Sequence, residues 1–124
     1  RVELARAGHV SPFLLRAAGG TVERLETPGP LLGLVPSAAF DEGIRSAAFT
    51  LAPGDLLFLH GCGLEGQRDG AGERFGADRI AGILRSQAGQ DAGQALSAVM
   101  VETEQFRAQP EPEEDLTALA LRFR

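Results

Sequence analysis

The sequence predicts one α+β domain in which mainly antiparallel strands come first, two helices follow, and a last strand returns to the sheet. Apolar residues that alternate with polar ones mark strands in the first sixty residues and again at the end of the chain. Between residues 77 and 106 the apolar residues recur every three or four positions, which is typical of amphipathic helices. A chain of 124 residues buries roughly two thirds of its unfolded surface, which is enough for a single core.

The composition excludes several classes of function. Seventeen acidic residues against 12 basic ones give a net charge of -5, which argues against a nucleic-acid groove and against an anionic membrane surface. No apolar run approaches the roughly 18 residues that a bilayer span needs, and no signal-peptide pattern is present, so we expect a cytoplasmic protein. One cysteine cannot form an internal disulfide, and the two histidines lie far apart in sequence, so no zinc-ligand spacing exists.

Three strands are predicted in the first quarter of the chain, at residues 1–6, 13–16 and 21–26. Gly19 and Gly20 separate the last two, and glycine readily adopts the positive φ of a hairpin turn. We therefore expect an antiparallel meander of three strands.

A proline-rich segment at residues 27–36 predicts an irregular loop. Its apolar side chains indicate that it packs onto the core, namely Leu31, Leu32, Leu34 and Val35. Residues 44–50 alternate weakly and predict another strand, after which Pro53-Gly54-Asp55 forms a turn. We assign Asp55 no role beyond completing that turn.

The next strand, at residues 56–59, is a continuous apolar run that stops at His60, the pattern of a strand covered on both faces. Closely spaced glycines follow from Gly61 to Gly72. Glycines just beyond a buried strand indicate that the backbone turns tightly or comes close to a ligand. This segment is the candidate site.

Two helices and a strand complete the chain. Residues 77–88 predict an amphipathic helix that Gly89 ends, and a second helix begins near Asp91, a good N-cap residue. Each helix is apolar on one side only, so both must lie on a sheet. The last strand, at residues 116–124, carries Ala118 and Ala120 on one face, where another layer can press closely.

Three segments together resemble the SpoIIE/RsbU-like branch of the metal-dependent type 2C (PPM) serine/threonine protein phosphatases. They are Ala7-Gly8-His9, the stretch PGDLLFLHGCGLEGQRDGAGERFG at residues 53–76, and Glu114-Asp115-Leu116-Thr117. The usual patterns of that branch are N-A-G-H, then P-G-D with an apolar strand, T-D-G-V-T-E-A and G-E-x-F-G, and finally D-D-x-T. Their order and spacing match over essentially all 124 residues.

The resemblance implies an αββα four-layer sandwich with mainly antiparallel sheets and a two-metal site for Mn²⁺ or Mg²⁺. A metal-activated water would hydrolyse phosphoserine or phosphothreonine, so no catalytic side chain is implied. The implied partner is a phosphorylated STAS-domain protein within the partner switching that regulates bacterial sigma factors, and an upstream sensor domain is compatible with this role. The family's G-D-x-x-D and D-x-S-G motifs are absent, and the chain opens at Arg1 within a strand pattern. We therefore expect residues 1–124 to be the C-terminal portion of one phosphatase domain, without a second domain.

The resemblance places the implied metal positions at Cys62, Gly63, Glu114 and Asp115. Cys62 stands where T-D-G has its aspartate, and a thiol is a soft ligand that suits Mg²⁺ and Mn²⁺ poorly. The implied site is therefore incomplete, and the alternative to hydrolysis is a metal-degenerate pseudophosphatase that acts as a protein-binding regulatory module.

Several residues near the site have both a functional and a plain structural interpretation. Cys62 is a reactive thiol or, as we favour, an inert buried residue. His60 could act as a general acid, but we favour a structural role for its side chain. His9 could contact phosphate, but we favour a hydrogen bond to the local backbone. Glu65 occupies the position of the second threonine in the family pattern. It either replaces one of the lost carboxylates or has no role at the metal. Glu114 and Asp115 bind metal or belong to a solvated acidic loop.

Overall fold

The computed structural model describes all residues from 1 to 124 and contains six strands and four helices. A four-stranded sheet has the order β3-β2-β5-β6, and β1 pairs with β4 in a separate two-stranded sheet. All strand pairs are antiparallel, in agreement with the predicted α+β class. The elements are β1 (Val2–Ala5), β2 (Phe13–Leu15), β3 (Val22–Arg24), α1 (Ser37–Gly43), β4 (Ser46–Phe49), β5 (Leu56–His60), α2 (Cys62–Gly66), α3 (Gly76–Ser86), α4 (Ala92–Phe106) and β6 (Ala118–Arg122).

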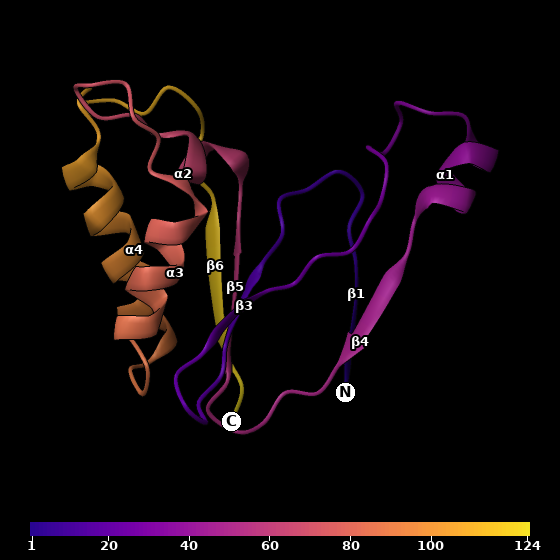
Figure 1. Cartoon of the computed structure of the whole chain (residues 1–124), viewed down its shortest axis with the longest axis horizontal. Helices are drawn as coiled ribbons and strands as arrows, with labels where there is room; N and C mark the ends of the chain where they lie inside the picture. The colour runs from indigo at the N-terminus through magenta and orange to yellow at the C-terminus, as the bar shows by residue number, and fades with distance from the viewer.

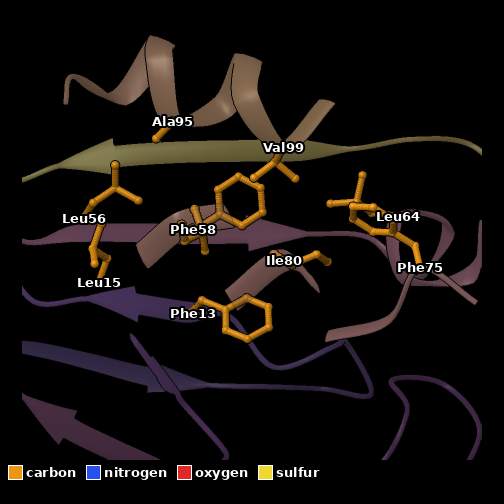
Figure 2. Packing of buried hydrophobic residues seen from close by; sticks show 10 residues of the cluster. Phe13, Leu15, Leu56, Phe58, Leu64, Phe75, Ile80, Ala95 and Val99 are labelled. Carbon is orange, nitrogen blue, oxygen red and sulfur yellow. The ribbon is translucent and has the colours of Figure 1, made fainter. Parts of the chain in front are cut away.

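The core lies between the four-stranded sheet and the helices α3 and α4, which cover one face of that sheet (Figure 1). Figure 2 shows Phe58 of β5 facing Val99 of α4, with Ile80 of α3 close by. All three side chains are fully buried, and burial stabilises each by roughly 1.5–3 kcal/mol. Ala118 and Ala120 of β6 pack against the same cluster, so the predicted close approach of a layer at these alanines is confirmed.

Burial along β5 alternates, and the prediction of a strand covered on both faces is wrong. Leu56, Phe58 and His60 are buried, whereas Leu57 and Leu59 are only partly buried. The helices cover one face of the sheet. On the opposite face, Leu57 and Leu59 pair with Leu121 and Leu119 of β6, and these two leucines of β6 are each 50% exposed. A continuous apolar run therefore does not show how many faces of the strand are covered.

The predicted meander of the first three strands is also wrong. β1 pairs with β4, with Val2 opposite Phe49, and only β2 and β3 form the predicted hairpin. Gly19 and Gly20 have φ values of 80° and 63°, as the hairpin turn requires. The alternation in β1 predicted a strand correctly, but it contains no information about which strand is its partner.

The proline-rich loop does not pack onto the core. Leu31, Leu32 and Leu34 are 51%, 74% and 72% exposed, so this prediction fails. The loop leads into α1, a seven-residue helix without buried residues, and the sequence pattern does not predict it. In Figure 1 the loop, α1, β1 and β4 lie on the side of the four-stranded sheet opposite α3 and α4.

The two long helices agree with their predicted positions. Asp91 caps α4 by accepting a hydrogen bond from the Gln94 N–H, and the Gln94 side chain accepts one from the Asp91 N–H, a complete capping box. Gly89, with φ of 84°, follows the end of α3. None of the helices combines the length and the apolar character that a membrane crossing requires.

Candidate functional site at the carboxyl end of β5

Two chain segments that are 52 residues apart in sequence at Cys62 and Glu114 meet just beyond β5. The Gly61 N–H donates to the Thr117 carbonyl at 2.9 Å, and α2 then passes against the residues that precede β6. A Cβ atom on Gly63 would overlap the carbonyl oxygen of Asp115 and lie 3.1 Å from the Glu114 Cβ. Only glycine therefore allows this close approach, as the dense glycines of the segment suggested.

The contact brings Cys62 and Glu114 together. The Cys62 Sγ donates to the Glu114 Oε2 at 3.4 Å. Cys62 is exposed, so the favoured interpretation of a buried thiol is wrong. Asp115 is also exposed, and its backbone carbonyl lies against Gly63 of α2.

A cavity of about 300 Å³ opens beside this contact. Three separate segments form its wall together with α2: the loop after β1, the glycine-rich hairpin and the acidic loop before β6. The lining residues are Val10, Cys62, Glu65, Gly66, Arg74 and Glu114.

His60 lies behind this cavity and not in its wall. It is 2% exposed and stacks on Phe13 with ring centroids 5.5 Å apart. Its Nδ1 is 3.1 Å from the Gly61 carbonyl, whereas its buried Nε2 has no hydrogen-bond partner and lies 3.5 Å from the Glu65 Oε1. Burial lowers the pKa of His60 below its usual value, an effect larger than the opposing ones of the Gly61 carbonyl and Glu65, so the ring is neutral near pH 7.

Glu65 is held by an arginine from another strand. The Arg24 Nη2 is 2.9 Å from the Glu65 Oε1, and the guanidinium of Arg24 also lies 5.6 Å from the centre of the Phe13 ring. This ion pair fixes α2 to β3. Glu65 reaches the cavity wall but makes no hydrogen bond to Cys62 or Glu114.

His9 belongs to a different part of the surface. It lines a second, more apolar cavity of about 220 Å³ that also includes Leu4 and Leu59. Its Nδ1 is 3.3 Å from the Val10 carbonyl, and its own carbonyl accepts a hydrogen bond from Arg6, the residue at the asparagine position of the family pattern. The structure therefore does not bring His9 into the Cys62 cavity.

Two residues of the glycine-rich hairpin at residues 67–75 were not singled out from the sequence. Gln67 is 2% exposed, and its Nε2 donates to the Gly63 carbonyl at 2.8 Å, which anchors the hairpin to α2. The Asp69 Oδ1 accepts from the N–H groups of Ala71 and Glu73, both at 2.9 Å, and thereby closes the turn. This hairpin places Arg74 in the cavity wall. The D-G-A-G sequence signals the turn, but nothing in it signals where Arg74 points.

Asp55 does more than complete its turn. The carboxylate is 2% exposed and accepts hydrogen bonds from the Ala52 N–H at 3.0 Å, the Ala17 N–H at 2.9 Å and the Arg16 guanidinium at 3.0 Å. Burial alone would raise the pKa of Asp55, but these donors outweigh it and the pKa lies below its usual value. Asp55 therefore joins the turn to the β2–β3 hairpin at the end of the sheet away from the cavity.

The donors that this chain supplies do not by themselves fit Mn²⁺ or Mg²⁺. No three histidine, cysteine, aspartate or glutamate side chains of the chain are grouped closely enough to hold a metal ion. At the cavity the donor pair is one carboxylate, Glu114, and one thiol, Cys62, whereas these hard cations take about six oxygen ligands.

Comparison with known proteins agrees with the fold and with the family that the sequence resembles. The family model "Stage II sporulation protein E (SpoIIE)" matches residues 1–124. None of the curated proteins gives a significant match.

Solved structures of phosphatase domains resemble the chain over nearly its whole length. The SiaA-PP2C domain of Pseudomonas aeruginosa is 25% identical with a TM-score of 0.75, covering 98% of this chain and 47% of that one. The Mn-presoaked phosphatase domain of SpoIIE from Bacillus subtilis is 18% identical with a TM-score of 0.65, covering 98% and 50%. The structure of the RsbU and RsbW domains of Rv1364c from Mycobacterium tuberculosis is 22% identical with a TM-score of 0.66, covering 98% of this chain and 32% of that one. The chain spans about half the length of the first two of these structures. It belongs to the SpoIIE family and has the fold of a type 2C phosphatase domain.

Proposed function

We propose that this chain is the C-terminal half of a SpoIIE-type protein serine/threonine phosphatase domain. Its substrate class is a phosphoserine or phosphothreonine protein of the STAS type. The observation that carries the proposal is the family match over residues 1–124, combined with the cavity at which Cys62, Glu114 and Arg74 converge, in the segments that correspond to the family's site motifs. The similarity in fold to the SiaA-PP2C domain and to the phosphatase domain of SpoIIE supports the assignment to a phosphatase domain.

Mn²⁺ or Mg²⁺ is the cofactor that the family implies, and it would supply an activated water and charge neutralisation at the phosphoryl group. Within this chain the only carboxylate at the cavity mouth without a cationic partner is Glu114, since Glu65 is paired with Arg24. Hydrolysis therefore depends on oxygen ligands from the other half of the domain. Cytoplasmic action within a partner-switching pathway belongs to the same proposal.

The second candidate function is that of a pseudophosphatase that binds its phosphorylated partner without hydrolysis. A specific observation favours it. The thiol at the family's aspartate position donates to the carboxylate of Glu114, so these two implied ligand positions hydrogen-bond to each other and provide one carboxylate where a metal site needs at least two.

Replacing Cys62 with aspartate separates the two candidates. The assay is release of phosphate from a phosphorylated STAS protein by the full-length protein, with Mn²⁺ added and with Mn²⁺ chelated. If the domain is an impaired phosphatase, Cys62→Asp raises the Mn²⁺-dependent rate by about tenfold or more, because it restores a hard ligand. The matched control is Cys62→Asn, which has nearly the same shape as aspartate but carries no charge, and it should give no increase.

The other outcomes have clear meanings. Measurable Mn²⁺-dependent activity in the wild type supports the phosphatase outright. Binding of the phosphorylated partner with no turnover in either the wild type or Cys62→Asp supports the pseudophosphatase. Equal nonzero activity in both would show that Cys62 does not lie at the metal and that the assignment of the loop is wrong.

A further inference from the structure

Arg74 is the one cation in the wall of the Cys62 cavity, and it has no partner within the chain. Its guanidinium makes none of the ion pairs of the structure, and only its backbone carbonyl is engaged, by Arg79. Arg24, by contrast, is paired with Glu65 of the cavity wall. An arginine that faces a concave, polar surface without a carboxylate partner is suited to bind an anion from outside.

The hairpin that carries Arg74 is already rigid before any ligand binds. Arg68 and Arg74 face each other across an isolated β-bridge, and the Phe75 N–H donates to the Gln67 carbonyl at 2.8 Å. Gln67 in turn is buried and bonded to Gly63 beside Cys62. The backbone of Arg74 is therefore fixed relative to Cys62 and Glu114, so little conformational entropy is lost there when the guanidinium binds.

The charges around the cavity allow an anion beside Arg74. Glu65 is neutralised by Arg24, which leaves Glu114 as the single uncompensated carboxylate of the wall. A volume of about 300 Å³ lies at the lower limit of the range of about 300–1,000 Å³ for ligand pockets. The cavity therefore suits one phosphorylated side chain better than a large ligand. Guanidinium matches the geometry of a phosphoryl group because it donates two parallel hydrogen bonds.

We propose that Arg74 binds the phosphoryl group of the partner's phosphoserine or phosphothreonine and holds it beside Cys62 and Glu114. This inference rests on the proposed function, and it applies equally to hydrolysis and to binding alone. Arg74 is in this sense a specificity-determining residue, because it distinguishes the phosphorylated partner from the unphosphorylated one.

The test measures binding and does not depend on turnover. The full-length protein is titrated with a synthetic peptide that carries one phosphoserine between alanines, with the same peptide unphosphorylated, and with inorganic phosphate. Arg74→Gln should weaken binding of the phosphopeptide and of phosphate by about tenfold or more, since it removes a charge-assisted bidentate contact. Arg74→Lys should retain part of the affinity, because an ammonium keeps the charge but not the fork geometry.

Arg85→Gln is the matched control, because Arg85 is an exposed arginine in the last turn of α3, outside the cavity. It should bind all three probes like the wild type. If the wild type prefers the phosphopeptide and Arg74→Gln retains that preference, the role of Arg74 is disproved while the proposed function stands. If the wild type itself shows no preference for the phosphopeptide and releases no phosphate from a phosphorylated STAS protein, both fail together.

Discussion

At the scale of single residues, Gly63 determines whether the two halves of the site can meet. No side chain fits between α2 and the Asp115 carbonyl, so the juxtaposition of Cys62 with Glu114 depends on a missing Cβ atom. The φ angle of Gly63 is not in the positive region, which means that space alone imposes the requirement for glycine.

Gly63→Ala should therefore destabilise the full domain by about 1–3 kcal/mol, the usual cost of overpacking a site whose neighbour is backbone. Gly66→Ala in the same short helix is the control, because a Cβ there would meet no heavy atom within 4 Å. It should change the free energy of unfolding by less than about 1 kcal/mol. Chemical denaturation measures both, and an equal effect of the two substitutions would contradict the close approach at Gly63.

At the scale of elements, Asp55 connects the turn before β5 to the hairpin of β2 and β3. Arg16 extends the connection, because its guanidinium also donates to the Thr50 carbonyl and pairs with Glu23 at 3.0 Å. One buried carboxylate thus satisfies donors from two separate turns at the same end of the sheet. This contact positions β2 against β5, and these strands carry Phe13 and His60 toward the site.

The stability of the domain should depend on the ionisation of Asp55. Its pKa in the folded state lies below the unfolded value of 3.8, so its stabilising contribution is complete above that value and is lost as the pH falls through the folded pKa. Asp55→Asn should lower the free energy of unfolding at pH 7 by about 2 kcal/mol, the range for hydrogen bonds to a charged group. The difference between wild type and variant should shrink below pH 4. A difference that stays constant from pH 7 to pH 3 would exclude this role.

At the scale of the whole molecule, the chain exposes more surface than a complete domain of its size. A folded monomer of 13.1 kDa exposes about 6,400 Å² by the usual scaling, whereas this chain exposes 7282 Å². Part of the excess lies on the face of the four-stranded sheet that the helices do not cover, where Leu119, Leu121 and Phe123 are 50%, 50% and 45% exposed. This agrees with a chain that spans about half of the phosphatase domains it resembles.

Residues 1–124 in isolation should consequently not behave as a well-folded monomer. We expect self-association and binding of a hydrophobic dye, because an uncovered apolar sheet face favours intermolecular contacts. Replacing Leu119 and Leu121 with lysine should reduce the association, whereas Val101→Lys, at a 45% exposed position on α4, should have little effect. Analytical ultracentrifugation tests this, and a monomer with a cooperative melt would contradict it.

Local structure and family were predictable from the sequence because their signals are local. Alternation or a short apolar run predicted each of the six strands, helical spacing predicted α3 and α4, and Asp91 was correctly identified as a cap. The ordered motifs identified the SpoIIE family, which the family model confirms over the whole chain. The two short helices α1 and α2 were missed, since five to seven residues rich in alanine and glycine carry no clear periodicity.

Pairing, coverage and side-chain partners were decided only by the tertiary structure. Nothing in the alternation of β1 specifies β4 as its partner, and the apolar run in β5 does not show that one face of the strand is only partly covered. The motifs placed Cys62 and Glu114 at ligand positions, but only the fold shows the thiol bonded to the carboxylate and Arg74 unpaired in the same cavity wall. The physical reason is that sequence patterns record local preference, whereas contacts between distant segments depend on how the whole chain packs.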